Sequence, residues 1–265
     1  MVNEEFLEFP AGRVHVLRSG DGPPLLFLHA AGGAGRWLEF HELLSKHFEV
    51  IAPDAPGFGG SDEFSEVESM DDLVYHYLDV LDRLGLDRPH VVGASFGGWL
   101  AAEIAVQAPH RVGSLVLLSA VGLRLPEHPV ADIFLMTPDQ VVDALFQDLS
   151  KASTAFPPDP DVEAILAIHR DMAALARFCW APFMANPKLE RRLHRITAPT
   201  MVVWPLGDKL VPIAHGRRYA ELIPDSRFAT VADCGHAMYF ERPDEFAVIT
   251  ADFLAAGAEL SGANR

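Results

Sequence analysis

Residues 90–98 have the sequence HVVGASFGG, in which a short apolar run is followed at once by Gly-x-Ser-x-Gly and then by a helical pattern. The run 90–92 predicts a buried strand. A sharp turn from a strand into a helix holds a serine in a strained, exposed conformation, and small residues two before and two after it let the backbone segments pass closely. Gly93 and Gly97 hold those two positions. The stretch therefore predicts that Ser95 is a nucleophile.

Other short runs rich in Val, Leu and Ile alternate with amphipathic helical patterns, of which 69–84 is the clearest. Runs that are apolar throughout fit strands buried between two layers of helices. The runs are Leu25 to His29, Glu49 to Pro53, His90 to Ala94, Ser114 to Ser119, Thr200 to Trp204 and Arg227 to Val231. This alternation predicts an α/β fold with a mostly parallel sheet of the eight-stranded type, flanked by helices. A hairpin that includes residues 13–18 adds antiparallel edge strands.

The alternation stops between Gly122 and Ile196, where the sequence has only helical patterns and Pro-rich turns. A long segment without strands between two core strands predicts an inserted helical lid. We therefore divide the chain into the first part of an α/β core at 1–121, a helical lid at 122–196 between the sixth and seventh strands, and the second part of the core at 197–265.

A serine hydroxyl is a poor nucleophile until a neighbouring base takes its proton, so a histidine must follow in the chain. His236 has the right place, just after the last predicted strand. The imidazole needs a carboxylate to fix its tautomer, and the expected chain order is Ser, acid, His. Asp208 fits this order, because it follows the strand that ends at Trp204. Asp233 is the remaining alternative, although His236 would have to fold back on it.

Acyl transfer also needs two backbone N–H groups aimed at the developing oxyanion. Phe96, directly after the nucleophile, supplies one. The second is expected from the small-residue loop HAAGGAG at 29–35, which allows the backbone to approach a substrate closely. Ala31 is our choice for this donor, and Ala30 is the near alternative.

Large apolar side chains in the lid predict an apolar acyl or aryl pocket, since ligand sites are mostly apolar and often lie between structural layers. Other apolar lid residues are expected to pack the lid onto the core. The residues that we assign to the pocket are Phe134, Trp180 and Phe183 in the lid, with Ala30 and Met238 outside it.

The composition excludes several classes of partner. A formal net charge of −16, with 37 acidic and 21 basic residues, disfavours nucleic acid and anionic membranes. The first residues, MVNEEFLEFP, lack the basic stretch and apolar run of a signal peptide, so we expect a cytoplasmic protein. Cys179 and Cys234 are too few for a disulfide framework and lack a metal-ligand spacing. We expect a small-molecule substrate, no metal and no cofactor, and a homo-oligomer remains open.

Five motifs in this order resemble the serine-nucleophile branch of the α/β-hydrolase superfamily, which includes carboxylesterases. The motifs are Leu28-His29 with its Gly-rich loop, the stretch from Asp54 to Ser61, the serine turn, Gly207-Asp208 before Val211-Pro212, and Gly235-His236. The resemblance covers almost the whole chain outside the lid. It implies the fold, a cap over the active site, and hydrolysis through an acyl-enzyme without a metal or an organic cofactor.

Within the superfamily, CGH at 234–236 followed by RPDEF at 242–246 resembles the meta-cleavage-product hydrolases, which break carbon–carbon bonds in ring-cleavage products. That group usually has Trp directly after the catalytic His, whereas this chain has Ala237 and Met238, and its serine turn often begins with Ser, where this chain has Gly93. These departures favour hydrolysis of a small to medium, largely apolar carboxylic ester. Carbon–carbon hydrolysis of vinylogous diketones is the alternative, and a lid-gated ligand sensor is a third hypothesis.

Overall fold

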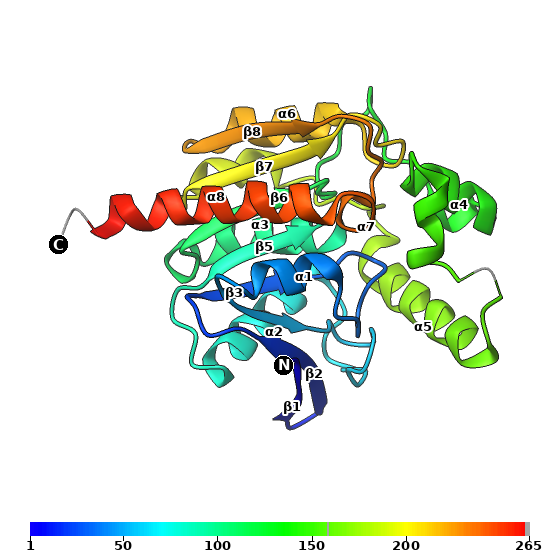
Figure 1. The fold of residues 1–265 in the computed structure, drawn as a ribbon, viewed down its shortest axis with the longest axis horizontal. Helices are drawn as coiled ribbons and strands as arrows, with labels where there is room; N and C mark the ends of the chain where they lie inside the picture. Colours follow the sequence, from blue (N-terminus) through cyan, green and yellow to red (C-terminus); the bar gives the residue numbers. More distant parts are fainter. Residues whose placement is uncertain (158, 263–265) are drawn as a thin grey trace.

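The computed structural model describes residues 1–157 and 159–262, which contain one sheet of eight strands in the order β1-β2-β4-β3-β5-β6-β7-β8 (Figure 1). The strands are β1 (Asn3–Phe9), β2 (Gly12–Ser19), β3 (Pro24–Leu28), β4 (Glu49–Pro53), β5 (His90–Ala94), β6 (Ser114–Leu118), β7 (Thr200–Pro205) and β8 (Ser226–Val231). β1 and β2 form an antiparallel hairpin, and β2 also pairs antiparallel with β4. All the other neighbouring strands pair in parallel. The predicted α/β fold and its mostly parallel sheet are confirmed.

Helices cover both faces of the sheet, which explains why β3, β5 and β6 are buried along almost their whole length. The core helices are α1 (Glu39–Leu44), α2 (Met70–Arg83), α3 (Phe96–Gln107), α6 (Ile213–Leu222), α7 (Met238–Glu241) and α8 (Pro243–Gly262). α1 and α8 pack together over one face, and α2, α3 and α6 cover the other (Figure 1). Each face therefore has its own apolar core.

The helix expected from residue 69 is α2. Its N-cap is Ser69, whose hydroxyl accepts the N–H of Asp72 while the Asp72 carboxylate accepts the N–H of Ser69. This reciprocal cap satisfies N–H groups that the first helical turn leaves free. The apolar stripe from Met70 to Leu81 is buried against the sheet.

Among the described residues between β6 and β7, the structure has helical elements and one isolated bridge, between Gly122 and Ala185. They are η2 (Ile133–Leu135), α4 (Pro138–Leu145), η3 (Leu149–Thr154), α5 (Val162–Cys179) and η4 (Glu190–Arg195). In Figure 1, α4 and α5 lie beyond the carboxyl ends of the parallel strands, where a ligand of an open α/β sheet is expected to bind. The limits of the lid at 122–196 stay our proposal.

Candidate active site

Ser95 is the single residue between the end of β5 and the start of α3, and its backbone has φ 52° and ψ −111°. A residue with a side chain rarely adopts a positive φ, so the turn is strained. The small neighbours permit it. A Cβ atom on Gly93 would collide with the carbonyl oxygen of Gly97, and one on Gly97 would collide with the carbonyl oxygen of Leu28. The two glycines are therefore required where the sequence places them, because three backbone segments meet at the nucleophile.

A continuous hydrogen-bonded chain joins the three residues expected to form a triad. The hydroxyl of Ser95 lies 2.9 Å from His236 Nε2, and His236 Nδ1 lies 2.8 Å from a carboxylate oxygen of Asp208. The side chains of His236 and Asp208 are only 3% and 1% exposed. With a carboxylate at Nδ1, that nitrogen carries the proton, and Nε2 is free to accept the proton of the serine.

The backbone around Asp208 explains why this carboxylate is well oriented. Its second oxygen accepts the N–H groups of Leu210 and Val211 at 3.0 Å and 2.8 Å, so both oxygens are held. The alternative acid, Asp233, is exposed and makes no side-chain hydrogen bond to His236 in the part of the chain that the structure describes. The geometry thus favours Asp208.

The predicted oxyanion hole consists of the N–H groups of Phe96 and Ala31. Within residues 1–157 and 159–262, neither N–H donates to another backbone carbonyl, so both are available to a substrate. His29 orients the loop, because its Nε2 accepts the N–H of Ala55 at 2.9 Å and its Nδ1 donates to the carbonyl of Ala30 at 2.7 Å. Since an amide N–H only donates, His29 is the neutral Nδ1–H tautomer. The use of these two N–H groups in catalysis stays a prediction.

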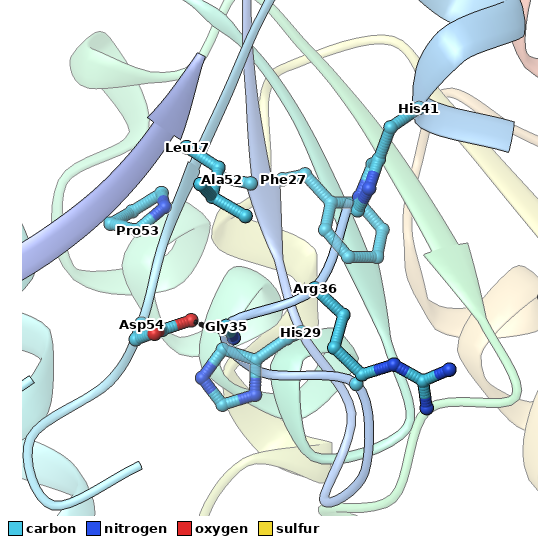
Figure 2. A pocket seen from close by; sticks show the side chains of 10 residues that line it. Leu17, Phe27, His29, Gly35, Arg36, His41, Ala52, Pro53 and Asp54 are labelled. Carbon is cyan, nitrogen blue, oxygen red and sulfur yellow. Dashed lines mark hydrogen bonds between the residues drawn. The ribbon is translucent and has the colours of Figure 1, made fainter. Parts of the chain in front are cut away.

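The buried carboxylate of Asp54 also hydrogen-bonds to this loop. The sequence analysis did not single out Asp54 as a site residue. One oxygen of Asp54 accepts the N–H of Gly35 at 2.6 Å, and the other accepts the N–H of Gly60 at 2.8 Å and Nδ1–H of His15 at 2.7 Å. Figure 2 shows Asp54 and Gly35 joined in this way beside a small cavity. Asp54 therefore connects the loop expected to carry the oxyanion donor to the loop after β4 and to the N-terminal hairpin.

His15 faces carboxylates on both sides, because its Nε2 lies 3.1 Å from Glu4 while its Nδ1 contacts Asp54. Carboxylates only accept, so both ring nitrogens donate and the imidazole is positively charged. The hydrogen bond to Asp54 raises the pKa of His15, against the effect of burial. The motif that contains Asp54 was recognised in the sequence, but nothing near His15 in the chain indicated this partner.

The residues assigned to the pocket fall into two groups. Phe134 packs against Trp180 and Phe183, with ring centroids 5.7 Å and 6.2 Å apart, and Trp180 is 63% exposed. Ala30 and Met238 are instead buried in the core between the sheet and the helices α1 and α8. Phe134, Trp180 and Phe183 thus form one cluster, and Ala30 and Met238 lie apart from it.

A second lid aromatic contact reaches the nucleophile turn. The ring of Phe178 on α5 lies 5.9 Å from that of Phe96, and Phe96 in turn stacks on Phe58 at 5.6 Å. Phe178 is buried, so it packs α5 against the residue that follows Ser95. The sequence analysis did not assign Phe178 to the pocket, and it expected apolar residues of 122–196 outside the pocket to pack against the core.

The described residues contain no group of three or more His, Cys, Asp or Glu side chains placed to hold a metal ion. Burial raises the pKa of the thiols of Cys179 and Cys234, so neither is an activated nucleophile. None of the helices that the structure describes is long and apolar enough to span a membrane.

The fold and this arrangement define a class, the serine hydrolases with an α/β core. A family model described as "Alpha/beta hydrolase family" matches residues 25–249, and the chain belongs to that family. The resemblance inferred from the five motifs is therefore confirmed.

Similar curated proteins are named as hydrolases of 2-hydroxy-6-oxo compounds. A 2-hydroxy-6-oxononadienedioate/2-hydroxy-6-oxononatrienedioate hydrolase of Paraburkholderia phymatum is 33% identical over 91% of both chains. A 2-hydroxy-6-oxo-2,4-heptadienoate hydrolase of Pseudomonas putida is 31% identical over 89% of this chain and 91% of its own. A 2-hydroxy-6-oxo-6-phenylhexa-2,4-dienoate hydrolase of Burkholderia cepacia is 28% identical over 92% of each.

Solved structures share the fold at lower identity. A membrane phospholipase A superposes with a TM-score of 0.83 at 23% identity, covering 97% of this chain and 87% of the other. A meta-cleavage product hydrolase from Pseudomonas fluorescens superposes with a TM-score of 0.79 at 24% identity, covering 95% of this chain and 97% of the other. Proteins of different activity thus share this architecture, and the fold alone does not choose a substrate.

Proposed function

We propose that this chain hydrolyses a carbon–carbon bond in a vinylogous 1,5-diketone ring-cleavage product. The observation that carries the proposal is that seven curated relatives, 28–33% identical over about nine tenths of both chains, are all named as hydrolases of such 2-hydroxy-6-oxo compounds. Ester hydrolysis, which the sequence analysis placed first, becomes the second candidate. The observation that favours this second candidate is that Ala237 and Gly93 differ from the residues usual at these positions in the meta-cleavage-product hydrolases.

In the proposed reaction, Ser95 attacks the ketone carbonyl next to the scissile bond while His236 Nε2 takes the hydroxyl proton. The Ser95–His236 distance of 2.9 Å is within the range for this transfer. Asp208 accepts the Nδ1–H of His236, keeps the ring in the required tautomer and stabilises the imidazolium that forms. The N–H groups of Phe96 and Ala31 are proposed to stabilise the oxyanion.

The carbon–carbon bond then breaks in the keto tautomer of the substrate. The substrate reaches this tautomer when the proton of its 2-hydroxyl moves to the carbon that later leaves. On cleavage, the electron pair of the bond moves into the conjugated carbonyl system of the departing fragment as a dienolate. The dienolate oxygen takes the proton held by His236, so this fragment leaves as a 2-hydroxydienoate. The other fragment stays as an ester on Ser95 until water, deprotonated by His236, releases it as a carboxylic acid. We infer that the cluster of Phe134, Trp180 and Phe183 contacts the apolar end of this small-molecule substrate.

The test is a time course with a synthetic 2-hydroxy-6-oxo-dienoate, followed by the loss of its visible absorbance, beside p-nitrophenyl esters of increasing acyl length. Ser95→Ala is the control. Turnover of the dienoate that depends on Ser95 and exceeds ester turnover supports the proposal, and fast ester turnover with an inert dienoate overturns it in favour of an esterase.

Turnover below about one per second on both classes would instead favour the ligand-sensor hypothesis, because this is the lower end of typical enzyme rates. The cytoplasmic location, the absence of nucleic-acid partners and the oligomeric state stay predictions from composition.

A further inference from the structure

Glu241, the last residue of α7, is a buried carboxylate at the junction between the lid and the loop that carries His236. It is 6% exposed. One oxygen accepts the N–H groups of Gln147 and Asp148 at 3.0 Å and 2.6 Å, and the other accepts the N–H of Gly235 at 2.6 Å. A buried charge is tolerated when charge-assisted hydrogen bonds of this kind saturate it. Glu241 therefore joins two segments of backbone that are far apart in the sequence.

The lid segment at 145–148 lies directly on the histidine loop. The N–H of Ala237 donates to the carbonyl of Leu145 at 2.9 Å. A Cβ atom on Gly235 would lie 2.6 Å from that same carbonyl oxygen and 2.7 Å from the backbone nitrogen of Gln147, so no side chain fits there. The residues before and after His236 are thus both hydrogen-bonded to the lid, one through Glu241 and the other directly.

The acid loop joins the same junction. The N–H of Gly207, next to Asp208, donates to the carbonyl of Cys234 at 3.0 Å. The histidine loop is therefore held between the lid on one side and the acid loop on the other. A shift of Gly235 moves His236 relative to both of its triad partners.

We propose that Glu241 is a positioning residue, which aligns His236 with Ser95 by fixing the histidine loop to the inner segment of the lid. The proposal rests on the proposed function, in which His236 is the general base. Glu241 has no hydrogen bond to a triad residue within the described part of the chain, so it acts through the backbone of Gly235. As a consequence, the correct position of His236 depends on the contact between the lid segment 145–148 and the histidine loop.

The variant Glu241→Gln tests this idea with almost no change of volume. The three backbone groups that hydrogen-bond to the carboxylate are all donors, and the thiol of Cys234 also donates to it at 3.7 Å. A glutamine must therefore turn its own NH₂ either toward the two lid amides or toward the amide of Gly235, and each orientation sets a donor against a donor. In either orientation the side chain loses its hydrogen bonds to the lid amides or its hydrogen bond to Gly235. It then no longer connects the lid to the histidine loop.

The matched control is Glu245→Gln, four residues further on in the first turn of α8, where the glutamate is exposed. The first readout is the rate at which a fluorophosphonate labels Ser95, measured by intact mass, because it reports activation of the hydroxyl without requiring the natural substrate. The second is the separation of kcat from KM on the substrate that the wild type turns over. Thermal melting shows that each variant is folded at the assay temperature.

We expect Glu241→Gln to lower the labelling rate and kcat by tenfold or more, since a misplacement of about 1 Å in a catalytic group costs up to a hundredfold. KM should stay within twofold, because Glu241 does not touch the substrate. Glu245→Gln should match the wild type. A folded Glu241→Gln protein with the wild-type labelling rate and kcat overturns the inference, and so does a loss that appears in KM alone.

Gly235→Ala keeps the test decisive if Glu241→Gln does not fold. The added Cβ pushes the lid segment away from the histidine loop while Glu241 is unchanged. It should reproduce the loss of labelling, and a folded Gly235→Ala protein with the wild-type rate refutes the coupling. If a fluorophosphonate labels the wild type but not Ser95→Ala, Ser95 is the nucleophile of the proposed function. The results for Glu241→Gln and Gly235→Ala then test only the positioning role of Glu241. If the wild type is not labelled, the proposed function and the inference fail together.

Discussion

Replacing Asp54 by Asn removes one charge from a side chain that is 4% exposed and whose hydrogen-bond partners in the described part of the chain are all donors. Its two oxygens accept from Gly35 on one side and from Gly60 and His15 on the other. An asparagine offers one acceptor oxygen and one NH₂ group. Whichever way it turns, the NH₂ faces a backbone N–H at a distance that suits a hydrogen bond, so at least one buried donor is left without a partner.

The magnitude follows from the kind of interaction that the substitution removes. Removing one partner of a buried ion pair costs about 3–5 kcal/mol when the other charge is left buried and uncompensated. Here His15 keeps one contact to Glu4, whose side chain is 65% exposed, so the charge of His15 is compensated only in part. Deprotonation of His15 relieves part of this cost at neutral pH. We therefore expect the free energy of unfolding to fall by about 3 kcal/mol, a large share of the roughly 5–15 kcal/mol that a typical protein has. Since Gly35 is released, kcat should fall as well.

The assay is urea unfolding followed by tryptophan fluorescence, together with kcat on the substrate of the wild type. The matched control is Asp62→Asn, because the side chain of Asp62 is 44% exposed and accepts the N–H of Arg13 on the same hairpin. An exposed site of this kind contributes less than about 1 kcal/mol. If Asp54→Asn costs no more than Asp62→Asn and leaves kcat unchanged, the reasoning about the buried carboxylate is wrong.

Three further predictions concern the same region. Asp208→Asn should lower kcat by about 10⁴ with little change in KM, because His236 loses the partner that selects its tautomer, and steady-state kinetics against Ser95→Ala measure this. Gly97→Ala should abolish folded expression or Ser95 labelling, because its Cβ would collide with the backbone at the end of β3, whereas an unaffected variant would contradict the geometry. The hydrogen bond to Asp54 raises the pKa of His15, so its contribution to stability is fully present below its unfolded pKa of about 6.5 and is lost as the pH rises through the raised folded pKa. The stability difference between the wild type and His15→Gln should therefore shrink from pH 6 upward in urea titrations, and a difference that grows with pH would contradict the charged form.

In the sequence, only residue types at single positions distinguish the two reactions. The absence of Trp after His236, with Ala237 in its place, favoured an ester over a diketone. The relatives favour the diketone instead, over about nine tenths of both chains. Reaction preference depends on the whole shape and charge of a pocket, and one neighbouring residue is a weak measure of it.

The strands that the sequence predicts correspond to β3 to β8, with each end within one residue of the observed bound. This accuracy has a local cause, because strands buried on both faces are short apolar runs with turns on either side. The serine turn was equally visible, since its glycines are required by contacts only a few residues away or with the adjacent strand. The sequence by itself thus determined the α/β core and the identity of the serine turn.

Tertiary structure alone decided what holds the site in place. His15 and Asp54 are 39 residues apart, and Glu241 and Gln147 are 94 apart. Such pairs leave no periodic signal in the chain, because a hydrogen bond between distant segments needs only one suitable donor and acceptor and imposes no pattern on the residues around them. The same reason explains why the sequence left Asp233 open beside Asp208. The fold brings only Asp208 within 2.8 Å of His236 among the described residues, because the loops after β7 and β8 lie side by side at one edge of the sheet.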